Sequence, residues 1–309
     1  MYYTEGYSKI SRLCSAFFVG SLVYTLAAFF ELYSLTIAVS TVLFFLVEKI
    51  RIKRFSFFPF GFFSSGEAVS EKFHQAALLC LSSGIFMATL VIINNEFLNF
   101  VSMKKLTLDT FFLGFSFPLS LITLSVVFSM LKSIESDILK KIMELCFWSI
   151  TLGVIIFFIF ILSEHLFVQI LVTAVLFCAV VTVFILYLKF AEGIQQKLFL
   201  SSGIGFLIFT AITGIAYIFL EIPGDYDPAK VKWLLHMHVF ASLYGWNLCG
   251  LTVICRFKDF PIAVSSPVVI GLHWLVAIVL APLGVFYGGF AILALVVYSF
   301  VTLSLYLST

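Results

Sequence analysis

Charged residues are scarce in this sequence. Only 11% of its 309 residues are Asp, Glu, Lys or Arg, whereas 62% are hydrophobic and 18% are aromatic. Soluble domains contain about 25% charged residues, so this composition excludes an ordinary soluble protein. The sequence therefore predicts an integral membrane protein with an all-α fold, a polytopic bundle of transmembrane helices.

A long polar segment is also missing. The longest polar stretch is residues 49–72, "KIRIKRFSFFPFGFFSSGEAVSEK", which is too short and too rich in phenylalanine to fold alone. Basic residues mixed with aromatic ones are typical of a loop that rests on anionic headgroups. We interpret the basic cluster first as a topology signal. We expect residues 1–309 to form a single integral membrane domain.

Sequence signatures of soluble enzymes are absent. The sequence contains no Walker loop, no G-x-G-x-x-G, no H-E-x-x-H and no G-x-S-x-G. Its six cysteines form no C-x-x-C pair, so neither a zinc ribbon nor a disulfide framework is indicated. The basic residues are dispersed and form no stripe, which argues against a nucleic-acid partner. We predict no metal and no cofactor, we expect membrane lipids as partners, and the sequence leaves open whether the chain is an enzyme.

Apolar segments of about 20 residues, the length that crosses a bilayer, recur along the chain. With both termini in the cytoplasm, 14 of the 18 Lys and Arg residues lie in inner segments, as the positive-inside rule requires. Only Glu31 separates the first two segments, and the alternative of one long tilted helix gives a weaker charge asymmetry. We therefore expect a multi-pass protein of the cell (inner) membrane with both termini cytoplasmic. Its ten predicted spans are residues 13–30, 33–47, 74–93, 108–131, 142–162, 166–188, 198–220, 234–254, 262–281 and 287–307.

Ionisable residues near the outer ends of three spans are the main functional candidates. Asp109 begins the fourth predicted span, Glu221 ends the seventh, and His238 lies about one turn into the eighth. An ionisable side chain is costly in lipid and normally faces the bundle interior or a water-filled cavity. Tyr217 lies four residues before Glu221, and Ser242 lies four after His238, on the same helical faces. We predict that these five residues line a substrate or proton cavity in the extracytoplasmic half, and we assign no catalytic residue.

The same helical faces also fit helix packing. Small and hydroxylated residues at helical spacing let membrane helices approach and hydrogen-bond one another, and we favour this role for the Ser, Thr, Gly and Cys positions. The two faces consist of Thr210, Thr213, Tyr217 and Glu221 on the seventh span, and of His238, Ser242, Gly245 and Cys249 on the eighth.

His236 and His273 are secondary candidates. Side chains two positions apart on a helix point about 200° from one another, so His236 and His238 cannot bind one metal together. We expect His236 to face the headgroup region. His273 lies about halfway into the ninth span, where we favour a neutral imidazole that donates to a neighbouring carbonyl over a proton relay. We expect His74 to be a boundary residue at the cytoplasmic edge of the third span.

The stretch from Leu200 to Ile254, "LSSGIGFLIFTAITGIAYIFLEIPGDYDPAKVKWLLHMHVFASLYGWNLCGLTVI", resembles the end of the YndJ-like membrane domain of bacteria. In that family a Tyr and a Glu close one helix, a loop with Asp follows, and the next helix opens with "HG.LNALGF". A second segment from Leu106, "LTLDTFFLGFSFPLSLITL", is similar to the family's "HFHFAGFALPLL" segment. The residues of this chain that fall on the first pattern are Tyr217, Glu221, His238, Gly245 and Trp246.

The chain departs from the family pattern at three positions. When the earlier segments are aligned on Gly114 and Pro118, Asp109 and Phe111 stand where the family has two histidines. Ser242 replaces the Asn that follows the family's later histidine. A metal or catalytic site that depends on those groups is therefore not expected to carry over. The resemblance implies a multi-pass fold and transport of a solute that has not been established.

Two functions fit these residues. The first is a transporter-like protein in which a carboxylate near a histidine couples to protons or binds a cationic or polar solute. The second is an intramembrane enzyme that acts on a lipid or lipophilic intermediate, with Glu221 or Asp109 as general acid/base and His238 as its partner. An accessory membrane subunit is a third interpretation. We favour transport because the sequence has no recognisable catalytic motif and because the family resemblance implies it.

Overall fold

The computed structural model describes residues 2–5, 10–100, 112–132, 136–162, 166–193, 195–221, 228–257 and 265–307. These residues are almost entirely helical, and the only extended pairing among them is one isolated bridge between Leu131 and Ala191. Within the same ranges, eight helices are long and apolar enough to cross a membrane, and the apolar helix Gly114–Ser129 is shorter. The chain is therefore an all-α, multi-pass membrane protein.

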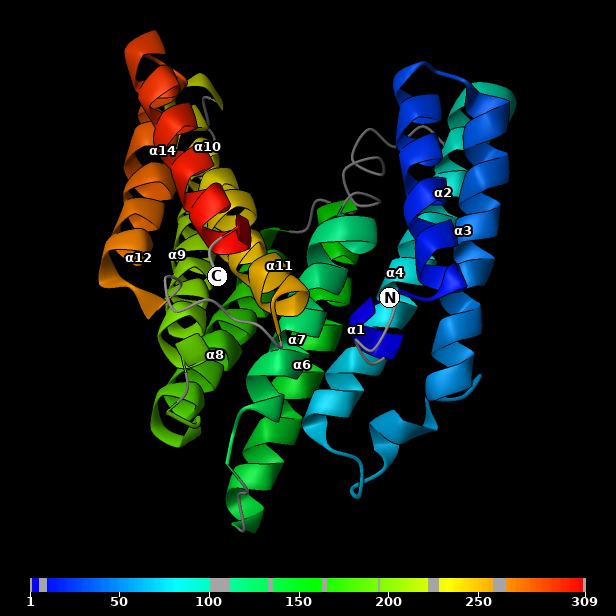
Figure 1. Cartoon of the computed structure of the whole chain (residues 1–309), viewed down its shortest axis with the longest axis horizontal. Coiled ribbons are helices and arrows are strands. Elements are labelled where there is room, and N and C mark those ends of the chain that lie inside the picture. The colour runs from blue at the N-terminus through cyan, green and yellow to red at the C-terminus, as the bar shows by residue number, and fades with distance from the viewer. Residues whose placement is uncertain are drawn as a thin grey trace. The chain divides into compact units, whose positions relative to one another are not determined.

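Contacts divide the chain into two compact units, Met1–Ser125 and Val126–Thr309. In the first unit, α2, α3 and α4 pack as successive neighbours, coloured blue to cyan in Figure 1. That these units belong to a single membrane domain stays a prediction. The elements of the first unit are α1 (Tyr2–Glu5), α2 (Arg12–Phe29), α3 (Tyr33–Arg54), η1 (Phe60–Phe63), α4 (Val69–Ile93), η2 (Asn94–Leu98), η3 (Phe112–Ser116) and most of α6 (Phe117–Ser129).

The first two predicted spans are separate helices rather than one long tilted helix. α2 ends at Phe29 and α3 begins at Tyr33, and between them Glu31 adopts a φ of 56°, in the left-handed region. The backbone N–H of Leu32 donates to the carbonyl of Ala27 at 2.8 Å and closes the turn. The two helices then lie side by side (Figure 1). A single charged residue therefore marks a tight turn between two helices.

A buried arginine holds the loop that joins α3 to α4. The Arg51 side chain is only 3% exposed, and its guanidinium donates to the Glu48 carboxylate, with one N–O distance of 2.7 Å. It also donates to the carbonyls of Ser56 and Phe57, both at 3.1 Å. Ser56 has a φ of 144°, a backbone conformation that favours glycine. The two hydrogen bonds from Arg51 therefore stabilise an otherwise strained start of the loop.

His74 is buried within the first unit, whereas its predicted position at the cytoplasmic edge of the span stays a prediction. Its side chain is 1% exposed, and its Nε2 lies 2.9 Å from the hydroxyl oxygen of Thr4. The imidazole also packs between the rings of Tyr3 and Phe55. The hydropathy pattern around His74 cannot reveal this burial, because the residues that cover it come from the short helix α1 and from the end of α3.

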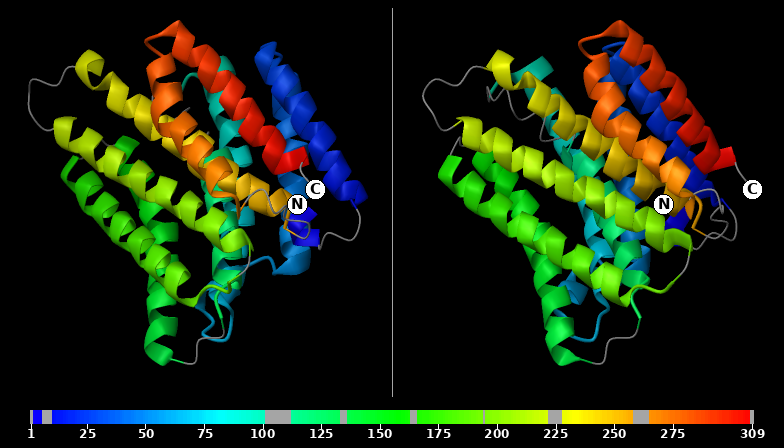
Figure 2. Two further views of the ribbon diagram at one scale, coloured as in Figure 1. Left: turned by 60° about the vertical axis from the view of Figure 1, so that its left-hand side comes forward. Right: turned by 90° about the vertical axis from the view of Figure 1, so that its left-hand side faces the viewer.

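The second unit contains two helical segments that are interrupted in the same way. The segments α10–η4–α11 and α12–η6–α13 each pass through a π-helical stretch and continue as one rod. α7, α8 and α9 are successive neighbours, and α14 packs along α12, η6 and α13 (Figure 2). The elements are the end of α6, α7 (Asp137–Leu162), α8 (Leu166–Phe190), α9 (Gln195–Glu221), α10 (Pro228–Phe240), η4 (Ala241–Asn247), α11 (Leu248–Cys255), α12 (Pro267–Trp274), η6 (Leu275–Leu280), α13 (Ala281–Gly284) and α14 (Gly288–Leu307).

Every predicted span overlaps a helix or a continuous helical segment, but the ends differ. α4 begins at Val69 rather than at residue 74, and α10 begins at Pro228 rather than at residue 234. Polar residues continue these helices because helical hydrogen bonding does not need apolar side chains, and proline is favoured at a first helical position. α3 is not among the eight helices that qualify as spans in the described part of the chain. The number of ten spans and the cytoplasmic termini therefore stay predictions.

Candidate functional site in the second unit

Three glycines on α9 let side chains from neighbouring helices approach its backbone closely. A Cβ atom placed on these glycines would lie between 2.9 and 3.1 Å from the nearest of those side chains. Such distances are shorter than ordinary van der Waals contact, so the positions admit no larger residue without a shift. The approaching residues are Cys249 at Gly203, Trp274 at Gly205 and His238 at Gly214.

His238 lies against α9 with one ring nitrogen bound. Its Nδ1 is 3.0 Å from the carbonyl oxygen of Thr210, and because a carbonyl only accepts, Nδ1 carries the hydrogen. The hydroxyl oxygen of Thr213 lies 3.4 Å from the same nitrogen. Nε2 makes no hydrogen bond to any residue in the described part of the chain. His238 therefore offers a ring nitrogen with a free lone pair inside the candidate span Val231–Cys255.

The hydroxyl groups that face His238 differ in their bonding. Thr213 and Thr210 are both buried, at 5% and 8% exposure. The Thr213 hydroxyl donates to carbonyls of its own helix, at Phe209 and Thr210. The Thr210 hydroxyl has no hydrogen-bond partner among the described residues. Next to His238, α9 therefore presents one satisfied hydroxyl and one that lacks a partner.

The other residues of the predicted cavity are only partly described. Ser242 is half-buried at the second position of η4, and Tyr217 is half-buried on α9. Glu221 is the last residue of α9, but its side chain and the whole of Asp109 lie outside the described residues. The His238 ring contacts α9 at Gly214, seven residues before Glu221, which corresponds to about 10 Å along the helix axis. The common cavity of these residues stays a prediction.

His273 donates to a neighbouring helix, as the favoured interpretation predicts. It is completely buried, and its Nε2 lies 2.6 Å from the carbonyl oxygen of Tyr244 in η4. The thiol of Cys249 lies 3.9 Å from Nδ1, the nitrogen that is left to accept. Both ring nitrogens are therefore engaged, and His273 joins α12 to the π-helical stretch of the neighbouring segment.

An aromatic stack packs against the His273 ring. The fully buried Phe206 ring on α9 stacks on Trp274 with centroids 4.0 Å apart and contacts His273 at 4.8 Å. The indole N–H of Trp274 donates to the hydroxyl of Ser202 at 2.8 Å. A Cβ atom on Gly245 would lie 2.5 Å from the Phe206 ring. The Phe206 ring can therefore occupy its position only because residue 245 has no side chain.

Replacing Trp274 by phenylalanine is expected to lower the free energy of unfolding by about 1 kcal/mol, because the variant loses a hydrogen bond but keeps an aromatic ring for Phe206 to stack on. Titration of the purified chain with SDS in mixed micelles, followed by circular dichroism, measures the change. Trp233→Phe is the matched control, because Trp233 is 49% exposed and its substitution is expected to change little. Equal effects of the two substitutions would contradict the importance of the Ser202 bond.

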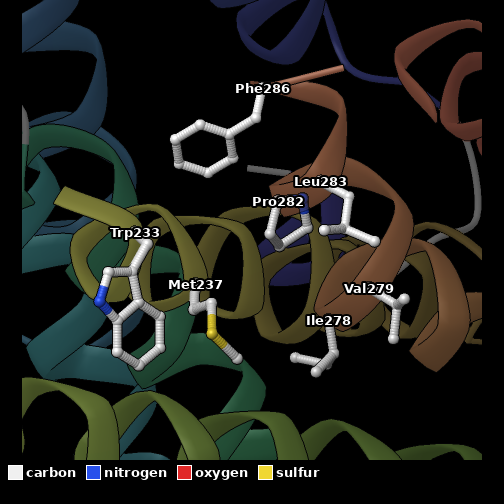
Figure 3. A pocket seen from close by; sticks show the side chains of 7 residues that line it. All are labelled: Trp233, Met237, Ile278, Val279, Pro282, Leu283 and Phe286. Carbon is white, nitrogen blue, oxygen red and sulfur yellow. The ribbon is translucent and has the colours of Figure 1, made fainter. Parts of the chain in front are cut away.

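An apolar groove lies between α10 and the η6–α13 segment (Figure 3). It has a volume of about 270 Å³, and side chains such as Trp233 and Phe286 are half exposed, so the groove is partly open. His236 lies beside it, with its ring centroid 6.2 Å from that of Phe286, and its buried Nδ1 has no hydrogen-bond partner among the described residues. The groove is lined by Trp233, Met237, Ile278, Val279, Pro282, Leu283 and Phe286.

The two histidines of the H-x-H sequence therefore face different neighbours, as their helical spacing predicts. His238 faces α9, whereas His236 faces Phe286 after α13. That His236 also faces the headgroup region stays a prediction. Neither the groove nor the two π-helical stretches has a recognisable signal in the sequence. The glycines of α9 were the available signal for the close approach of neighbouring helices, since glycine is enriched where membrane helices touch.

No protein-family model, no curated protein and no solved structure matches this chain. The resemblance to the YndJ-like membrane domain therefore stays a prediction from the sequence motifs.

Proposed function

We propose that this chain is a transporter-like protein of the cell (inner) membrane with its polar centre in the second unit. The observation that carries the proposal is the position of His238, whose ring lies within a candidate span with Nδ1 bound and Nε2 able to accept. An ionisable group at such a place is a functional candidate by default, and imidazole is suited to proton transfer. The proposed cargo is a polar or cationic solute whose movement is coupled to protons.

The interrupted segments of the second unit support the same function. η4 begins three residues after His238 and packs against α9, and η6 packs against η4. π-Helical stretches occur frequently at functional sites, and transporters use irregular helices to form their binding sites. The resemblance to YndJ-like proteins also favours transport. Tyr217 on α9 and Ser242 in η4 are the described residues that we propose to line the approach to His238 within the second unit. The roles of Asp109 and Glu221 stay predictions from the sequence.

Proton movement into proteoliposomes tests this function. The full chain is reconstituted with a pH-sensitive dye inside, and Na⁺, K⁺ and neutral amino acids are added outside in turn. The unmodified protein is expected to change the internal pH with at least one of them. His238→Ala is expected to abolish the change, because the free ring nitrogen is lost, and Glu221→Gln is expected to abolish it as well.

His273→Gln is the control for this experiment, because both ring nitrogens of His273 are already engaged. Its transport rate is expected to stay close to that of the unmodified protein, provided that circular dichroism shows a folded variant. A folded His238→Ala variant that transports at the unmodified rate would remove His238 from the mechanism and with it the main support for the proposal.

A lipid-handling protein is the second candidate function, and the apolar groove favours it. The helices on both sides of the groove belong to candidate spans, so a hydrocarbon chain from the bilayer can enter the groove. Met237→Trp is expected to fill the groove and to reduce the amount of lipid that copurifies with the chain, as measured by mass spectrometry. Leu235→Trp is the control on the same helix, because Leu235 is 40% exposed and does not line the groove. Equal lipid retention in the two variants would argue against this function.

A further inference from the structure

Four phenylalanine side chains project from the loop between α3 and α4. Phe57, Phe58, Phe60 and Phe63 are between 59% and 77% exposed. Phe62, in the same loop, differs from these four because its side chain is buried within the first unit. Exposed aromatic side chains in such density are unfavourable in water, since they leave a large apolar area in contact with solvent. The surface formed by the four exposed residues is called the phenylalanine face below.

The loop is held in place, so the phenylalanine face cannot turn inward without breaking contacts. Arg51 donates to the carbonyls at the start of the loop, and Phe62 anchors its middle in the first unit. Gly61 lies close to the buried side chain of Gln75 on α4, since a Cβ atom there would be 3.3 Å from the Gln75 Oε1. The exposure of the face is therefore a property of a fixed loop.

Two exposed lysines precede the loop that carries the phenylalanine face. Lys49 and Lys53, near the end of α3, are exposed and form no ion pair with any residue in the described part of the chain. Arg54 is also near the loop but pairs with Glu71, at 3.0 Å. Glu67 is the exposed acidic residue of the loop. Lys49 and Lys53 thus precede Phe57 by eight and four residues in the sequence, and no described carboxylate pairs with either of them.

We propose that the phenylalanine face and the two lysines form a binding surface for anionic phospholipid at the membrane interface. The loop is followed directly by the candidate span Val69–Leu98, so it lies where a span meets the headgroups. At that level aromatic rings enter the boundary between headgroups and acyl chains, and lysines attract anionic headgroups. The surface thus recognises the combination of an apolar chain and a negative phosphate, and it does not depend on a transport function.

Quenching by brominated lipids tests the binding surface in the full chain. The Phe60→Trp variant is reconstituted in nanodiscs of phosphatidylcholine and phosphatidylglycerol, with either lipid brominated on its acyl chains. The fluorescence that the substitution adds to the four native tryptophans is measured. Brominated phosphatidylglycerol is expected to quench this added signal several-fold more than brominated phosphatidylcholine at the same mole fraction, because the lysines enrich the anionic lipid locally.

Two further variants separate the possible results. Phe62→Trp places the reporter at a buried position of the same loop and is expected to be quenched weakly by both lipids. Lys49→Gln with Lys53→Gln, added to Phe60→Trp, is expected to equalise quenching by the two lipids. Equal quenching of Phe60→Trp with both lysines present would overturn the preference for anionic lipid. An absence of quenching by either lipid would show that protein covers the face and would overturn the proposal entirely.

Discussion

Replacing Arg51 by methionine is expected to lower the free energy of unfolding by about 3–5 kcal/mol. The substitution removes one partner of a buried ion pair, so the Glu48 carboxylate, 15% exposed in the pair, loses its counter-charge. It also leaves the carbonyls of Ser56 and Phe57 without their donor. SDS titration followed by circular dichroism measures the loss, and limited proteolysis is expected to show faster cleavage in the loop between α3 and α4.

Arg54→Met is the matched control for this prediction. Arg54 pairs with Glu71 near the same end of α3, but the two side chains are 35% and 37% exposed. Solvent screens such a pair, so its loss is expected to lower the free energy of unfolding by about 0–1 kcal/mol. If the two substitutions were equally damaging, burial of the Arg51 pair could not be the reason for the effect.

Gly245→Ala is expected to lower the free energy of unfolding by about 1–3 kcal/mol, because it overpacks the core of the second unit. The added methyl group would lie 2.5 Å from the Phe206 ring, and that ring is held by its stack on Trp274 and its contact with His273. Movement of Phe206 therefore disturbs several neighbours at once. The same substitution is expected to reduce transport, because η4 directly follows the helix that carries His238.

Gly271→Ala provides the comparison within the same unit. Gly271 lies in α12, and apart from its chain neighbours and the local helix backbone no described atom lies within 4 Å of the position that a Cβ would take. An alanine there is expected to leave stability unchanged or to raise it by up to about 1 kcal/mol, since alanine favours the helix more than glycine does. A loss of stability in both variants would show that helix flexibility, rather than the Phe206 contact, explains the effect of Gly245→Ala.

The positions of the helices could be predicted from the sequence because the bilayer requires long apolar segments. The turn between α2 and α3 could also be predicted, because Glu31 is a single charged residue within a long apolar stretch. The π-helical stretches could not be predicted in this way, because Ala241–Asn247 and Leu275–Leu280 have side chains that suit an α-helix equally well. Hydropathy determines where a helix lies, but it does not determine how many residues each of its turns contains.

Predictions for individual polar residues depended on whether their partners are local. For His273, the kind of bond was predicted correctly, because a buried imidazole needs an acceptor, but its partner Tyr244 is distant in sequence. The burial of His74 cannot be predicted from its neighbours in the sequence, because part of its cover comes from Thr4, 70 positions earlier. The predicted helical face of Thr210 and Thr213 is buried beside His238, whereas the relation of Asp109 and Glu221 to this site stays a prediction.

The π-helical stretch η4 also affects which changes in length the chain can tolerate. A π-helical hydrogen bond encloses one residue more than an α-helical one, so the stretch accommodates a surplus residue. Loss of one residue within Ala241–Asn247 can convert the stretch to α-helix and keep α11 at its present angle to α10. Loss of one residue within α10 instead rotates everything after it by about 100° and removes Cys249 from Gly203. We therefore expect natural insertions and deletions in this segment to concentrate in the π-helical stretch Ala241–Asn247.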